Sequence, residues 1–364
     1  MNKKSKEYRN ALLKYCASFA YSSFLHYSGL LDKIYRENIT KGDLPYRILN
    51  YQHVANPTEL PFPIMPDSWI SPVAFEKQMR YLKRNTHLIS LSELLENLKE
   101  EKPLPPATTV VTFSPGHKDF YTQALPIIKD YRIPCTLFVP TSFIGTNNSL
   151  WSDKVLLTCR IMQHLSIPFP ELPFIDEKFY LLTRTKKNAV KIHEDFPFLL
   201  VLYLQILPSQ QCYLNLLHLF SYFAEKNSLP VYSYFLSWEE LQNIAKQKIE
   251  IASCGDNYKL FNFTSAEELL ADIMLSVKTL FDHGIEPISC VMASDKEPLS
   301  QSIRRALKEA GISEVLNPYC QKDILDKNTF ALEHKTIIIN QALAYIPILL
   351  TTIWKIKLFK AKIK

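Results

Sequence analysis

The sequence predicts an α/β fold, either a barrel or an open parallel sheet, because short apolar segments alternate with amphipathic helical segments. The clearest strand is 108–113, a β-branched run that ends in a phenylalanine and a Ser-Pro-Gly turn. A helical segment over 121–131 and a second apolar run at 135–139 follow it. This strand, helix, strand order is the unit from which parallel sheets and barrels are built.

The same alternation continues on both sides of this unit. We expect further strands at 47–51, 88–90, 249–253 and 288–292, and helices at 72–85, 265–283 and 299–310. A further helix is expected to begin at Ser92, with this serine at its cap. Another helix begins after Ser237, where the spacing lets the Glu240 carboxylate reach back to the cap. Between 152 and 235 the pattern changes to long aromatic-rich helical stretches, which we interpret as an inserted subdomain.

These patterns divide the chain into five regions. They are an N-terminal amphipathic helical region (1–45), the first part of a barrel (46–151), the helical insertion (152–235), the second part of the barrel (236–335) and a C-terminal strand with a basic tail (336–364). No internal repeat accompanies the alternation, so one large domain with extra elements is expected.

The composition is that of a globular protein without a nucleotide-binding loop. Hydrophobic residues make up 47% of the 364 residues, which is enough for a large core. A net charge of +6, with basic residues gathered at the two ends, disfavours nucleic-acid binding. Seven cysteines at irregular spacing fit poorly with a disulfide framework and indicate a reducing compartment.

Both ends of the chain carry features of a membrane-surface contact, for which ordinary alternatives exist. The stretch 11–31 lacks the uninterrupted apolar core and cleavage site of a secretory signal, and its spacing fits a helix lying on a surface or packed in a core. The run 337–339 predicts a buried strand, and the basic tail from Lys355 contacts anionic lipid or stays solvated. We expect a cytoplasmic protein, with the inner face of the membrane as the alternative location.

Several linked blocks of sequence resemble the polysaccharide deacetylase family of carbohydrate esterases. The blocks are Ile48–Val54, Phe75–Leu82, Leu88–Leu94, Val110–Phe113, Gly116–Phe120, Ala124–Ile127, Ile133–Val139, Phe143–Gly145 and the region 238–316. Together they cover most of the chain outside the insertion and the ends. The resemblance implies a distorted (β/α) barrel of the polysaccharide deacetylase type with a helical insertion, and a carbohydrate partner.

The resemblance places the general base and one metal ligand directly after strand 108–113. In the family this strand is followed by Asp-Asp-Gly, where the first aspartate is the base and the second binds the metal. Here the two positions are Ser114 and Pro115. A serine hydroxyl is not a base near neutral pH, and a proline side chain has no atom that binds a metal.

The resemblance places the other two metal ligands after the strand that ends at Ser253. In the family they are histidines four residues apart, and here those positions carry Cys254 and Tyr258. A thiol and a phenol beside a proline are a poor ligand set for zinc. The third family motif, which supports the oxyanion, falls near 289–295 and lacks its characteristic residues. We therefore expect no cofactor, and a divalent metal such as zinc only if the site is rebuilt.

Residues that remain near the predicted carboxyl ends offer weaker candidates. His117, Cys254 and Asp256 include a candidate base and two candidate ligands, although loop and packing roles are the simpler interpretation. His53 follows the first strand and, with Ser114 and Cys254, is a candidate for substrate binding.

Two further interpretations concern the turn after strand 108–113. Asp119 fits a helix cap better than a catalytic base. A serine hydrolase centred on Ser114 is disfavoured because the Gly-x-Ser-x-Gly turn is missing.

The leading hypothesis is a catalytically inactive deacetylase-like protein, a pseudoenzyme that acts in cell-envelope polysaccharide metabolism as a glycan-binding or scaffold protein. The first alternative is an active deacetylase, a hydrolase of carbon–nitrogen bonds, with a non-standard site. The second alternative is a membrane-associated interaction protein that uses the insertion and the basic tail.

Overall fold

The computed structural model describes the barrel, most of the insertion's helices and one C-terminal strand. The described residues are 46–56, 64–65, 68–175, 179, 196–204, 207, 209–226, 234–258, 265–293, 300–316 and 336–339. The predicted N-terminal helix and the basic tail lie outside them. Within these ranges, no helix is both long enough and apolar enough to cross a membrane.

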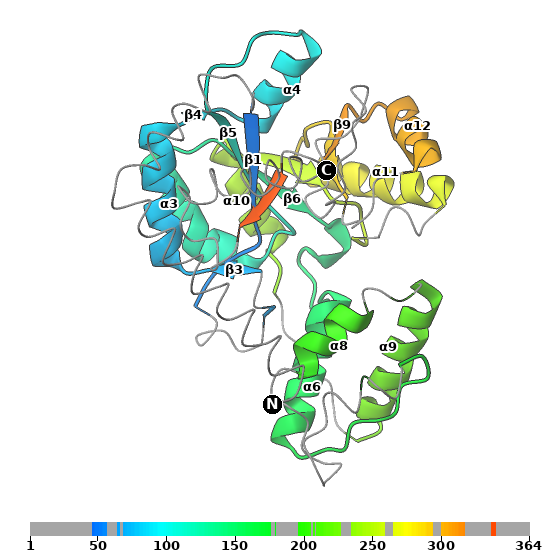
Figure 1. Cartoon of the computed structure of the whole chain (residues 1–364). Helices are drawn as coiled ribbons and strands as arrows, with labels where there is room; N and C mark the ends of the chain where they lie inside the picture. Colours follow the sequence, from blue (N-terminus) through cyan, green and yellow to red (C-terminus); the bar gives the residue numbers. More distant parts are fainter. Residues whose placement is uncertain are drawn as a thin grey trace, which may run out of the picture.

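The centre of the fold is an eight-stranded sheet in which every strand pair is parallel (Figure 1). Its strands are β1 (Tyr46–Tyr51), β4 (His87–Leu88), β5 (Thr108–Phe113), β6 (Cys135–Val139), β7 (Glu250–Ser253), β8 (Cys290–Met292), β9 (Glu314–Leu316) and β10 (Thr336–Ile339). The order across the sheet is β10-β1-β5-β6-β7-β8-β9, and β4 pairs with the start of β5. The predicted distorted (β/α) barrel is confirmed.

The strands are buried on both faces, which explains their continuous apolar runs. Because successive side chains point to opposite faces, alternate residues enter different apolar clusters. Ile48, Val110 and Phe138 pack with side chains of β7 and β8 in one apolar cluster, the inner cluster. Their neighbours in the chain, such as Leu49 and Val111, pack in a second cluster with the surrounding helices.

Helices cover the outer face and one end of the barrel (Figure 1). They are α3 (Pro72–Asn85), α4 (Leu91–Lys99), α5 (Leu125–Tyr131), α10 (Trp238–Lys246), α11 (Ala266–Asp282) and α12 (Gln301–Glu309). Leu91 and Leu94 of α4 enter the inner cluster. The Glu250 carboxylate at the start of β7 accepts the backbone N–H of Leu91 at 3.2 Å, so α4 closes the amino end of the barrel.

The insertion contributes three described helices, which lie together on one side of the sheet (Figure 1). They are α6 (Trp151–His164), α8 (Phe196–Leu204) and α9 (Ser209–Ala224). These helices pack around a separate apolar cluster that includes Val155, Leu200 and Phe223. The chain returns to the barrel at Tyr234, where its backbone carbonyl accepts the N–H of Lys118 at 2.7 Å.

Most predicted elements are present, but one local prediction is wrong. The cap of α4 is Ser90, whose hydroxyl accepts the N–H of Glu93, so Ser92 lies inside the helix. The helix predicted over 121–131 is present, and its first part, Phe120–Ala124, is π-helical before α5 begins. At α10, the expected capping box between Ser237 and Glu240 is confirmed.

Candidate functional site

Ser114 occupies the position at which the resemblance places the general base, and its hydroxyl is already hydrogen-bonded. The side chain continues the inward alternation of β5 and is 1% exposed. Its Oγ accepts the Asn50 amide at 3.2 Å, and the Asn50 carbonyl accepts the Thr112 hydroxyl at 3.0 Å. Neutral side chains that are hydrogen-bonded to one another therefore stand at the base position, and no carboxylate does.

Cys254 occupies one of the expected metal-ligand positions and is part of the apolar core. It is 1% exposed and packs in the inner cluster with Met292 and the partly buried Tyr258. Burial, with a smaller contribution from the Asp272 carboxylate, raises the pKa of the Cys254 thiol well above its usual value. The thiolate that would bind a metal is therefore strongly disfavoured.

The loop after β7, which in the family carries the ligand histidines, is fixed here by α11. Oδ2 of Asp272 accepts the backbone N–H of Asp256 at 2.9 Å, and Oδ1 accepts the Asn257 side-chain amide at 3.0 Å. Asp256 itself accepts the Thr141 hydroxyl at 2.7 Å. Its carboxylate serves to join this loop to the loop after β6.

The residues at the family ligand positions do not fit a zinc ion. Pro115 has no donor atom, Cys254 is buried as a thiol, and Tyr258 lies against the same apolar cluster. A search of the described ranges finds no group of three histidine, cysteine or acidic side chains placed to hold a metal. We therefore derive no chemical step through a metal.

The rebuilt site suggested for His117, Cys254 and Asp256 is not assembled. The three side chains have different neighbours: His117 stacks on His53, Cys254 lies in the inner apolar cluster, and Asp256 bonds to Thr141. Among the three substrate-binding candidates, Ser114 and Cys254 face the barrel interior, whereas His53 lies in a different cluster.

His53 and Asp119 form a buried pair, which is an ion pair when the His53 ring is protonated. The two-residue strand β2 (His53–Val54), paired with β3 (Trp69–Ile70), places the ring so that its Nδ1 lies 3.1 Å from Asp119 Oδ1. Asp119 Oδ2 accepts the backbone N–H of Val54 at 2.7 Å. The expectation that Asp119 caps a helix is wrong, because its side chain makes no cap hydrogen bond and binds β2 instead.

His117 stacks on His53 with ring centroids 3.9 Å apart and ring planes 20° apart. A short antiparallel bridge with Phe235, where the chain returns from the insertion, buries His117 to 3% exposure. Burial and the neighbouring His53 lower the pKa of His117 well below its usual value, so the ring is neutral near pH 7. His117 lies in the loop after β5, as the simpler interpretation expected, and it is buried there.

Asp153, in the first turn of α6, is a member of this cluster that the sequence did not indicate. Burial raises its pKa to about 6, against the opposing effects of His53 and the Ser152 hydroxyl. Burial lowers the pKa of His53. The Asp119 carboxylate and, less strongly, the Asp153 carboxylate raise it by more than burial lowers it, so the pKa of His53 lies above its usual value. The insertion thus brings a carboxylate within electrostatic range of His53.

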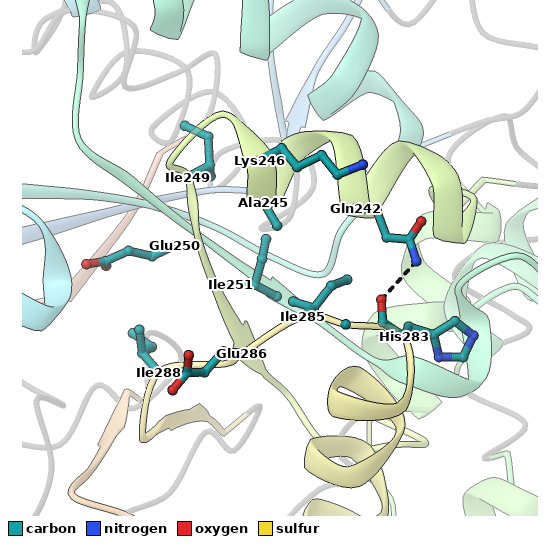
Figure 2. Close-up of a pocket in the computed structure, with 11 residues that line it drawn as sticks. Gln242, Ala245, Lys246, Ile249, Glu250, Ile251, His283, Ile285, Glu286 and Ile288 are labelled. Carbon is teal, nitrogen blue, oxygen red and sulfur yellow. Dashed lines mark hydrogen bonds between the residues drawn. The ribbon is translucent and has the colours of Figure 1, made fainter.

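A hollow lies at the amino ends of β7 and β8. It has a volume of about 590 Å³ and is lined by the end of α10, the start of β7 and the connection between α11 and β8. In Figure 2 the Gln242 amide points to the backbone carbonyl of His283, which it reaches at 2.8 Å. The hollow adjoins the amino ends of β7 and β8, whereas catalytic residues of such barrels lie at the carboxyl ends.

Comparison with known proteins supports the resemblance of the sequence. The chain is 32% identical over 80 residues to a poly-β-1,6-N-acetyl-D-glucosamine N-deacetylase of Staphylococcus aureus, which is 22% of this chain and 27% of that enzyme. It is 30% identical over 74 residues to the enzyme of the same name from Escherichia coli K12, or 20% of this chain and 11% of that enzyme. The matches thus span about a quarter or less of these relatives. No protein-family model matches the chain.

The fold comparison extends over most of the molecule. The deacetylase PplD of Streptococcus pyogenes, solved with acetate, superposes with a TM-score of 0.50 over 85% of this chain and 97% of that one, at 12% identity. The chain shares the fold of the polysaccharide deacetylases. The barrel is present here, while the positions at which the resemblance places the base and the ligands carry Ser114, Pro115, Cys254 and Tyr258.

Proposed function

We propose that this chain acts in polysaccharide metabolism as a glycan-binding or scaffold protein that does not deacetylate its ligand through a bound metal. The observation that carries the proposal is the bond between Asn50 and Ser114. This hydrogen bond joins two neutral, buried side chains, and one of them, Ser114, stands at the base position. The buried Cys254 thiol at a ligand position supports the same conclusion.

The names of the relatives suggest the ligand class. Both matching enzymes are named for poly-β-1,6-N-acetyl-D-glucosamine, so we propose a polymer of N-acetylated glucosamine as the bound glycan.

Calorimetry on the full chain tests this function. We expect saturable binding of a β-1,6-linked N-acetylglucosamine oligomer, no stoichiometric zinc binding, and no acetate in the reaction mixture. The S. aureus deacetylase, assayed with the same oligomer and zinc, serves as the active control. Stoichiometric zinc binding together with acetate release by this chain would overturn the proposal.

One observation favours a second candidate, an N- or O-deacetylase with a non-standard site. The His53–Asp119 pair has the arrangement of a histidine base oriented by a carboxylate. Replacing His53 by glutamine separates the two candidates, because an enzyme that uses this base loses most of its turnover. Alanine at Ser114 and Cys254 tests the original positions in the same assay.

A further inference from the structure

The insertion presents an apolar surface that its own core does not use. Most of the large hydrophobic side chains that are exposed in the described residues belong to the insertion rather than to the barrel. Tyr213, Leu214 and Leu217 are 63%, 37% and 51% exposed, and their spacing places them on one face of α9. On the other side of this helix, Leu219 and Phe223 pack in the apolar cluster of the insertion. Helix α9 is therefore apolar on two sides.

Exposed apolar side chains of the insertion are not confined to α9. Leu199 of α8 is exposed, and so is Phe174. The backbone N–H of Phe174 donates to Oδ1 of Asn215 at 3.1 Å, so Phe174 lies beside α9. Figure 1 shows α9 apart from the helices that cover the barrel. The apolar surface is thus a feature of the insertion and is separate from the barrel mouth.

The sequence of these two helices is almost free of charge. From 196 to 224, a run that covers α8, α9 and their connection, there is no lysine, arginine, aspartate or glutamate, and His218 is its single histidine. Helices at the surface of soluble proteins carry charged residues on the face turned to water. Helix α11 of the barrel follows this rule, because Lys278 lies among its exposed residues Met274 and Phe281. The exposed face of α9 has no such charge.

The absence of charge over this whole run favours a lipid bilayer over a protein partner. A protein interface is depleted of charge at its centre but keeps a polar rim. A helix that enters the acyl region of a bilayer avoids charges along its length, because each one is costly to bury in hydrocarbon. Tyrosines are enriched at the boundary between acyl chains and headgroups, and Tyr213 lies on the exposed face. The first cation after the run is Lys226, which reaches back to the Tyr222 hydroxyl at 2.9 Å.

We propose that the insertion binds the surface of a lipid bilayer by burying the exposed face of α9 between headgroups and acyl chains. With 16 residues, α9 is about 24 Å long, shorter than the hydrocarbon core of about 30 Å, so it lies along the interface. Because no charged side chain of α9 takes part, binding does not require anionic lipid. The inference is independent of the proposed glycan binding and assigns a role to the insertion.

The test is flotation of the full chain with phosphatidylcholine vesicles at about 0.5 M salt, where attraction between exposed charges is screened. We expect the chain to float with the vesicles. We expect Tyr213→Asp and Leu217→Asp each to weaken this binding about tenfold, because a carboxylate then enters the apolar boundary. Both side chains are exposed, so the variants should unfold at the temperature of the wild type.

Matched controls are Met274→Asp and Phe281→Asp, which alter equally exposed apolar residues of α11 and should float like the wild type. Flotation that Tyr213→Asp and Leu217→Asp leave unchanged would overturn the proposal. Flotation that requires phosphatidylserine and disappears at high salt would also overturn it, because that pattern belongs to the basic tail. A chain that ignores vesicles but forms dimers that Leu217→Asp dissociates would show that a second copy covers this face instead. The calorimetric test of glycan binding stands apart from all these outcomes.

Discussion

The Asp272 carboxylate on α11 accepts the backbone N–H of Asp256 at 2.9 Å and thereby holds the loop that leaves β7. In the family that the sequence resembles, that loop carries two ligand histidines. In this chain the Asp272 carboxylate of the neighbouring helix holds the loop through hydrogen bonds. The loop is therefore ordered by hydrogen bonds within the protein.

Gly255→Ala should strongly destabilise the protein. Gly255 has a φ of 82°, and a Cβ there would collide with the Asp272 carboxylate. We expect a loss of about 3 kcal/mol in the free energy of unfolding, measured by urea titration. Gly284→Ala is the control, because its φ is 73° but no atom lies within 4 Å of the added Cβ. It should lose only about 1 kcal/mol, and equal losses would contradict the steric account.

Asp272→Asn should also destabilise, through the loss of charge-assisted hydrogen bonds to the loop. Hydrogen bonds to charged groups contribute about 1.5–3 kcal/mol, and an asparagine offers a single acceptor oxygen. We expect faster amide hydrogen exchange at Asp256 and Asn257 in the variant, with the exchange at Leu137 of β6 unchanged. A protein with unaltered protection in the loop would show that Asp272 does not order it.

Asp153→Asn should stabilise the protein above pH 6 and leave it unchanged near pH 4. Burial raises the pKa of Asp153 from 3.8 to about 6, so the folded state binds its proton more tightly than the unfolded state. Above pH 6 the ionised, buried carboxylate lowers stability, and this cost disappears as the pH falls through 6 toward 4. We expect a gain on the order of 2 kcal/mol at pH 8. Thermal unfolding across this range measures it, and a pH-independent difference would contradict the assignment.

Glu250→Gln should lower the free energy of unfolding by weakening the contacts at the amino end of the barrel. Oε2 of Glu250 accepts the Thr136 hydroxyl at 2.7 Å and the backbone N–H groups of Leu91 and Ser92 at the start of α4. Loss of the negative charge at this helix terminus should cost about 1 kcal/mol of unfolding free energy. Glu286→Gln, an exposed change at the same hollow, should fall within about 0.5 kcal/mol of the wild type.

The parallel sheet could be predicted because buried parallel strands require continuous apolar, β-branched runs, as in 108–113. The helices could be predicted from local capping chemistry, although the sequence offers both Ser90 and Ser92 as the capping residue of α4. The Ser-x-x-Glu spacing from Ser90 to Glu93 was the correct indication, since its hydroxyl accepts the Glu93 N–H.

The histidine cluster could not be predicted, because it depends on contacts between distant segments. Asp119 has the local sequence of a cap, yet its carboxylate bonds to Val54, 65 residues earlier. Burial of His117 depends on Phe235, where the chain returns from the insertion. No local pattern marks Asp153, which lies in a helix whose position relative to the barrel is a tertiary feature.

The most direct test of the central claim is the acetate methyl signal in a proton NMR spectrum, recorded while the full chain is incubated with the N-acetylglucosamine oligomer and excess zinc. Because Ser114 is held by Asn50 and Cys254 is a buried thiol, we predict that the oligomer binds and remains fully acetylated. Acetate that accumulates over many turnovers and stops when zinc is chelated would contradict the account.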